Sequence, residues 1–315
     1  MGLTRPAGPA GSTSPAEDFA RAVARYRPLE ALLPAHWSRG TVVANGAQHH
    51  YYRTGGGKPR LLLLHGFLDG APSWLRTALA LEDAFDVVMP DARGHGRSER
   101  SGPRFDPDQL AEDAAGIIRA LRLPAVRVLG HSMGGGTGIR LADRHPDLIR
   151  ALIVEGWGDA AASGADLAQT PQYQAWFSGY VAWLERLKTL DHAGRMASAL
   201  SQLPPGAPLL PEAEYVPWVD NCAQVDLELV RLGATLWSRV GADVTAMTEA
   251  LGRIGVPVLV MKSDFFPTPG QRRVRDEPSQ RANVRIGRFE HTGHLIHRDA
   301  FGPFVERVRE VFLDH

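Results

Sequence analysis

Residues 126–136 read VRVLGHSMGGG, and this stretch predicts the local structure on which the rest of the fold depends. An apolar, β-branched run ends in Gly-x-Ser-x-Gly around Ser132 and leads into a helix-prone segment, residues 137–144. Strand, sharp turn and helix in this order are the context of a nucleophile elbow, whose apex residue adopts a strained backbone conformation. A β-carbon on Gly130 or Gly134 would collide with the neighbouring strand or helix. We therefore expect Ser132 to stand clear of the backbone, at a helix N-terminus that favours negative charge.

Strands and helices alternate on both sides of this turn. Strands are predicted at residues 60–64, 86–90, 126–130, 150–154, 257–261 and 284–289, preceded by a hairpin with an Asn-Gly turn at 41–53. Only helical periodicity recurs in the interval 158–255, in pieces at 172–190, 192–203, 212–232 and 244–254. A last amphipathic helix is expected at 299–312. The pattern predicts an α/β sheet that a helical segment interrupts between two of its strands.

This pattern divides the chain into four parts. Residues 1–15 are mostly Gly, Pro, Ala, Ser and Thr, and we expect them to be disordered. Residues 16–40 form a short N-terminal helical extension. Residues 41–157 and 256–315 together make the α/β core, and residues 158–255 make the helical insertion.

Charge and cysteine content narrow the classes of function. The 35 basic residues are balanced by 35 acidic ones, which argues against a nucleic-acid or anionic-membrane partner. Cys222 is the only cysteine, so an intrachain disulfide and a cysteine metal cluster are excluded. No apolar run approaches the length of a membrane span, and residues 1–30 lack the apolar core of a secretory signal. A cytoplasmic protein is therefore expected, with its oligomeric state left open.

Three further motifs follow predicted strands, where ligands bind in open parallel sheets. They are HGF at residues 65–67, DARGHGRS at 91–98 and EHTGH at 290–294. With the elbow at Ser132 they resemble the α/β-hydrolase superfamily, from about Thr41 to Phe312. The resemblance implies an α/β-hydrolase fold, a mostly parallel sheet flanked by helices, with residues 158–255 as a helical cap.

The resemblance also implies roles for individual residues. Ser132 would be the nucleophile, and His294 the general base that takes its proton and returns it to the leaving group. The backbone N–H groups of Phe67 and Met133 would form the oxyanion hole. His65 and His95 belong to motifs that shape loops in this family, and we interpret them as structural.

Two other histidines of the C-terminal region compete with His294 for the role of base. His291 lies close to the end of the last strand, and His297 precedes the final helix. The Gly-His spacing of the family favours His294. We expect His297 to cap or pack.

The third member of the triad is where the chain departs from the family. The usual acid follows the strand at 257–261, and Asp264 is the carboxylate available there, in a shortened turn. Some members place the acid after the strand that precedes the cap, which makes Glu155 a competitor and Asp159 an outside possibility. Gly156 occupies the register where that acid is expected. Asp264 is slightly preferred, and the true acid should lie within hydrogen-bond reach of a ring nitrogen of His294.

A serine at the elbow favours attack on an acyl carbonyl. The leading prediction is a serine hydrolase without metal or organic cofactor, a carboxylesterase or lactonase that forms an acyl-enzyme on Ser132. The cap is rich in aromatic residues, which favours an apolar acyl or aromatic small-molecule substrate. Candidate substrate-binding residues are Trp157, Trp176, Trp183 and Trp218. Trp176 and Trp183 fall at helical spacing, which also fits packing of the cap onto the sheet domain.

Several other activities fit the same motifs. Within the enzymes, these are a meta-cleavage-type carbon–carbon hydrolase, a cofactor-free perhydrolase and a biosynthetic thioesterase or cyclase. From another class, a ligand-binding receptor could keep this fold with feeble hydrolysis. Substrate identity depends on how the cap packs, which the sequence pattern alone does not fix.

Overall fold

A computed structural model describes residues 15–101, 106–157, 170–204, 207–237, 240–264, 274–277 and 279–314. Its centre is a nine-stranded sheet with the order β1-β2-β4-β3-β5-β6-β7-β9-β8. The strands are β1 (Ser38–Ala44), β2 (Ala47–Arg53), β3 (Arg60–Leu64), β4 (Asp86–Pro90), β5 (Val126–His131), β6 (Ile149–Glu155), β7 (Val258–Ser263), β8 (Val274–Glu277) and β9 (Val284–Phe289). The run from β4 to β9 is parallel, and antiparallel pairs lie at the edges, so the predicted mostly parallel sheet is confirmed.

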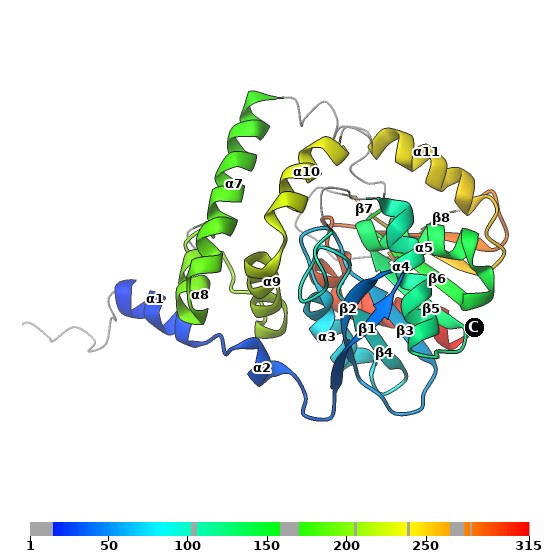
Figure 1. Ribbon diagram of the computed structural model, residues 1–315, viewed down its shortest axis with the longest axis horizontal. Coiled ribbons are helices and arrows are strands. Elements are labelled where there is room, and N and C mark those ends of the chain that lie inside the picture. Colours follow the sequence, from blue (N-terminus) through cyan, green and yellow to red (C-terminus); the bar gives the residue numbers. More distant parts are fainter. Residues whose placement is uncertain are drawn as a thin grey trace, which may run out of the picture.

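Helices cover both faces of this sheet (Figure 1). The alternation of side chains along β3 shows the division, because Leu61 and Leu63 enter one core and Leu62 and Leu64 the other. The first core is closed by η1 (Ala71–Trp74), α3 (Leu75–Leu81), α12 (Ile296–Asp299) and α13 (Phe301–Leu313). The second core is closed by α4 (Pro107–Ala120), α5 (Met133–Arg144) and α11 (Val240–Leu251), with the short η2 (Pro146–Leu148) following α5.

Four helices form a separate group beside the sheet, to the left in Figure 1. They are α7 (Pro171–Thr189), α8 (His192–Leu200), α9 (Glu212–Gln224) and α10 (Leu227–Trp237). The single helix predicted over residues 212–232 is wrong. Val225 is extended, and the carboxylate of Asp226 accepts the N–H of Glu228, so a new helix begins there.

Helix α11 packs differently from the other four. Its side chains Met247 and Ala250, with Ile254 just beyond it, join the core on the α5 side of the sheet. It therefore packs with the sheet although it falls inside the range 158–255.

The N-terminal extension lies against α8 and α9 (Figure 1). It comprises α1 (Pro15–Ala24) and α2 (Leu29–Leu32). The Tyr26 hydroxyl donates to the carbonyl of Leu210, and the Arg27 guanidinium pairs with Glu212. Residues 1–14, most of the segment expected to be disordered, lie outside the described residues. Across the part of the chain that is described, every helix is too short or too polar to cross a membrane.

Candidate active site

The turn between β5 and α5 holds Ser132 in a strained conformation. Its φ is 51° and its ψ −110°, a region that residues other than glycine rarely occupy. A β-carbon on Gly134 would overlap the carbonyl of Leu64, and one on Gly130 would overlap the carbonyl of Gly134. The Ser132 N–H donates to the carbonyl of Glu155 at 2.8 Å. These close approaches explain why residues 130 and 134 are glycines. Together with the hydrogen bond to Glu155 they hold Ser132 at the start of α5.

The backbone around Ser132 offers hydrogen-bond donors. Met133 is the first residue of α5, so its N–H has no acceptor within the helix. Phe67 lies in the loop after β3, where the Asp69 N–H donates to the carbonyl of Gly66 at 3.2 Å and closes a tight turn.

The histidines next to this loop hold its shape, as predicted. The Nδ1–H of His65 donates to the carbonyl of Gly66 at 2.8 Å, while Nε2 accepts the N–H of Ala92 at 2.9 Å. That pair of contacts corresponds to the neutral imidazole. The His95 ring contacts the Phe67 ring edge-on, at 5.7 Å between centroids.

His294 lies in the loop between β9 and α12, facing the end of β6. A β-carbon on Gly156, whose φ is +63°, would lie 3.2 Å from both Nδ1 and Cε1 of the His294 ring. That Nδ1 is buried and has no hydrogen-bond partner among the described residues. The carbonyl of His294 accepts a hydrogen bond from Nε2 of His131 at 3.2 Å. Burial and the neighbouring His131 lower the pKa of His294 to about 4, against the opposing effect of Glu155.

Both candidate acids lie near this loop, and both are bonded elsewhere. Asp264 follows β7, and its carboxylate accepts the backbone N–H groups of His291 at 2.8 Å and Thr292 at 3.1 Å. It thereby holds the left-handed turn at His291, whose φ is 60°. The fully buried Glu155 carboxylate accepts both the N–H and the Nδ1–H of His297, each at 2.8 Å.

Neither Asp264 nor Glu155 therefore makes the expected hydrogen bond to a ring nitrogen of His294. The reason lies in the end of β6, where successive residues face opposite sides. Glu155 points toward α12, and Gly156, which faces His294, has no side chain. Asp159 lies outside the described residues.

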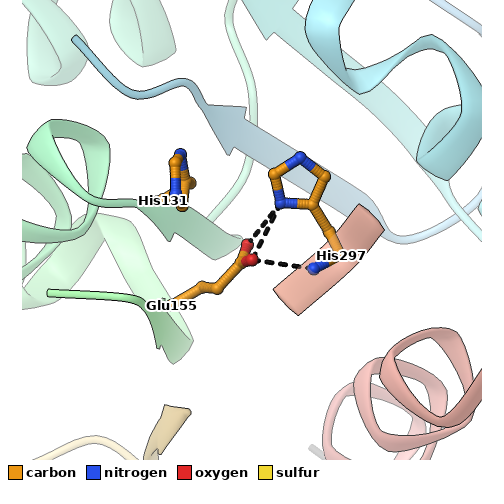
Figure 2. Close-up of side chains that lie close together, drawn as sticks. All are labelled: His131, Glu155 and His297. Carbon is orange, nitrogen blue, oxygen red and sulfur yellow. Dashed lines mark hydrogen bonds and ion pairs between the residues drawn. The ribbon is translucent and has the colours of Figure 1, made fainter. Parts of the chain in front are cut away.

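A buried group of ionisable side chains lies next to the turn that carries Ser132. Figure 2 shows the Glu155 carboxylate directed at His297, with His131 on the neighbouring strand. On its other side, Nδ1 of His131 lies 3.7 Å from a carboxylate oxygen of Asp69. Burial opposes the protonated form of His131, but Glu155 and Asp69 together raise its pKa. Burial likewise opposes ionisation of Glu155, yet His297 and His131 lower its pKa.

Sequence reasoning assigned no role to His131 or Asp69. His131 belongs to the elbow motif and Asp69 follows the HGF motif in the loop after β3. Their positions next to these motifs are the sequence signal that could have indicated a role. His131, Glu155 and His297 have ligand atoms within 4.8 Å of one another, and their residue types could bind a metal ion. The hydrogen bonds between Glu155 and His297 already satisfy both groups without one.

The four candidate tryptophans lie at different depths. Trp157 packs beside Gly135 at the start of α5, close to Ser132. Trp176 is 60% exposed and stacks on Tyr180, at 5.5 Å between ring centroids. Trp183 donates its Nε1–H to Ser198 and stacks on Trp218 at 5.8 Å, so both join the packing between α7, α8 and α9.

Other apolar side chains of α7 reach the loop after β3. Leu68, in that loop, packs in one cluster with Phe177 and Tyr180. The Tyr180 hydroxyl lies 3.8 Å from the sulfur of the buried Cys222. Phe177 and Tyr180 thus share an apolar cluster with Leu68, and Trp176 does not belong to it.

Comparison with known proteins places this geometry in a family. A family model described as the alpha/beta hydrolase fold matches residues 59–299. N-formylmaleamate deformylase of Pseudomonas putida is 28% identical over 279 residues, which cover 88% of this chain and 96% of the relative. A 2-hydroxymuconate semialdehyde hydrolase of a Pseudomonas species is 31% identical over 119 residues, covering 36% of this chain and 42% of the relative.

Solved structures share the fold across nearly the whole chain. The enol-lactonase from Burkholderia xenovorans has a TM-score of 0.58 at 24% identity, covering 88% of this chain and all of that one. An N-formylmaleamic acid deformylase from Pseudomonas putida has a TM-score of 0.63 at 21% identity, covering 86% of this chain and all of that one. From the family model and the shared fold, the chain belongs to the α/β-hydrolase family, and it is a hydrolase.

Proposed function

We propose that this protein hydrolyses a carboxylic ester or lactone through an acyl-enzyme formed on Ser132. The observation that carries the proposal is the strained backbone of Ser132 at the first turn of α5. A strained elbow of this kind exposes the hydroxyl, and the helix N-terminus favours the negative charge that develops on a carbonyl oxygen. No metal or organic cofactor takes part in this chemistry.

A named group of the protein serves each step of the proposed reaction. His294 accepts the Ser132 proton as Oγ attacks the carbonyl carbon, and it returns that proton to the leaving alcohol. The N–H groups of Met133 and Phe67 bind the oxyanion. A water molecule activated by His294 then releases the acid and restores Ser132. Asp264 and Glu155 act through the loop that carries His294, because that is where their hydrogen bonds lie.

The substrate side of the site is apolar. Leu68 of the loop after β3 and Phe177 and Tyr180 of helix α7 pack against one apolar cluster. Apolar surroundings of this kind favour an apolar acyl or aromatic group next to the scissile carbonyl. Trp157 lies beside Gly135 of α5 and packs against the core on that side of the sheet.

The deformylase match favours a second candidate function. Its name describes removal of a formyl group from nitrogen, and the match covers 96% of that relative. Hydrolysis of an activated N-acyl amide needs the same nucleophile, base and oxyanion hole as ester hydrolysis. The two candidates differ in the leaving group, which is a nitrogen in one and an oxygen in the other.

Burst kinetics test the proposal. Purified protein is mixed with p-nitrophenyl esters of increasing acyl length, with lactones, and with an N-formyl imide. We expect rapid acylation of one serine per chain, absent in Ser132→Ala and intact in the control Ser178→Ala, whose hydroxyl bonds within α7. Turnover by Ser132→Ala equal to wild type would refute the proposal, and binding of these compounds without turnover would favour a receptor.

A further inference from the structure

We propose that His131 and Glu155 are positioning residues that hold His294 in register with Ser132, in place of a carboxylate bonded to the His294 ring. This inference rests on the proposed function, because it concerns how the proposed base is aligned. It assigns roles to two buried side chains that do not themselves touch the reacting atoms.

The first observation is the surroundings of the His294 ring. Its buried Nδ1 makes no hydrogen bond to any residue that the structure describes, and the backbone facing it belongs to Gly156. In a triad, the acid bonded at this nitrogen fixes the orientation and tautomer of the imidazole. Here the carboxylate of Asp264 accepts backbone N–H groups, and the carboxylate of Glu155 is hydrogen-bonded to His297. The orientation of His294 therefore depends on its backbone and on the contact of its ring with that of His131, at 4.9 Å between centroids.

The second observation is how that backbone is held. The carbonyl of His294 accepts from His131 at 3.2 Å, and the N–H of Gly293 donates to Asp299 at 2.7 Å. Three residues after His294, the N–H and ring of His297 are bonded to Glu155. The loop is thus fixed at the base itself and on both sides of it.

The third observation is that the same two residues hold the nucleophile. His131 precedes Ser132 in the chain, and the carbonyl of Glu155 accepts the Ser132 N–H at 2.8 Å. The backbone of each residue is therefore joined to Ser132, by a peptide bond for His131 and by a hydrogen bond for Glu155. The side chain of each is hydrogen-bonded to the segment that contains His294 and His297. Moving either side chain would change the spacing between Oγ of Ser132 and the imidazole of His294, and misplacement by about 1 Å can cost roughly 10²-fold in rate.

The charges around His131 suit this role. Asp69 lies 3.7 Å from Nδ1 of His131, and Glu155 lies on its other side. Two carboxylates favour the imidazolium, in which both ring nitrogens are donors. In the imidazolium Nε2 always carries a proton, so the hydrogen bond from Nε2–H to the carbonyl of His294 does not depend on a choice of tautomer.

Steady-state kinetics of four variants test the proposal. His131→Ala and Glu155→Gln should each lose about 100-fold in kcat with KM changed less than about threefold, because alignment is lost and binding is kept. His131→Gln keeps a terminal N–H donor and should recover to within about tenfold of wild type. Asp264→Asn keeps one acceptor oxygen for the N–H groups of His291 and Thr292 and should lose no more than about tenfold in kcat, far less than a triad acid would.

Two controls separate positioning from general damage. His50→Ala removes another buried histidine that is bonded to a buried aspartate, Asp91, in a different part of the sheet. It should lower the melting temperature without lowering kcat. If Glu155→Gln does not fold, the comparison of His131→Ala with His131→Gln decides the question.

Several results would overturn the inference. One is a loss approaching 10⁴-fold in Asp264→Asn at unchanged melting temperature, which would make Asp264 the acid bonded to His294 during turnover. Another is equal kcat in His131→Ala and wild type, or an equal loss in His131→Ala and His131→Gln. Failure of the proposed function would look different, because the wild-type protein itself would then show no Ser132-dependent turnover.

Discussion

The pH dependence of catalysis follows from the environment of His294. The imidazole must be neutral to accept the Ser132 proton, so protonation of the free enzyme abolishes kcat/KM. Burial and the positive charge of His131 lower the pKa of His294 from 6.5 to about 4. Activity should therefore persist on acidification and fall with a midpoint near pH 4.

The size of this effect is easy to measure. At pH 5 a base of pKa 4 is about 90% neutral, whereas one of pKa 6.5 is about 3% neutral, a difference of roughly 30-fold in kcat/KM. Removing the charge in His131→Gln should move the midpoint upward, because His131 is one of the groups that lower the pKa of His294.

The assay uses an ester that does not ionise between pH 3 and 8, with product quantified after quenching. Samples returned to pH 7 after exposure to pH 4 must regain full activity, which controls for acid unfolding. A midpoint at pH 6 or above in the wild-type enzyme would refute this account of the His294 environment. A midpoint that stays unchanged in His131→Gln would refute the part assigned to His131.

Three other predictions concern the elbow, the helical group and metals. Gly134→Ala should abolish activity and lower the melting temperature, because its β-carbon overlaps a backbone carbonyl, whereas the nearest atom to a β-carbon on Gly136 is at 3.4 Å and Gly136→Ala should be tolerated. Folded, active Gly134→Ala would contradict the elbow geometry. Tyr180→Ala should change the preference among acyl chain lengths more than Trp176→Ala, because Tyr180 packs with the loop after β3 and Trp176 is 60% exposed; equal specificity profiles would contradict this. Dialysis against a chelator should leave activity unchanged, and loss that a divalent metal reverses would point to the cluster of His131, Glu155 and His297 as a metal site.

The fold was predictable because its strongest signals are local. The glycines around Ser132 are required by backbone contacts with β3 and α5, so the motif itself contains the geometry. The buried parallel strands are mostly apolar, with charged residues mainly near their ends, and they give a clear pattern. The short edge strand Val274–Glu277 has a mixed, partly exposed sequence, VRDE, and gives no such signal.

Helix ends and side-chain partners were harder to predict. The break at Val225 depends on one capping carboxylate, Asp226, inside a run that otherwise keeps helical periodicity. The partner of Glu155 is His297, in a segment 142 residues away along the chain. Which of two acids bonds which histidine depends on the direction of side chains at strand ends, and spacing in sequence does not contain that information.

The central claim is that Ser132 is the nucleophile, and covalent labelling tests it most directly. Intact-mass measurement after treatment with a fluorophosphonate, followed by peptide mapping, counts and locates the modified residue. We predict one adduct per chain, on Ser132, with parallel loss of ester hydrolysis and no adduct in Ser132→Ala. An adduct on a different residue, or hydrolysis that survives full modification of Ser132, would contradict the account.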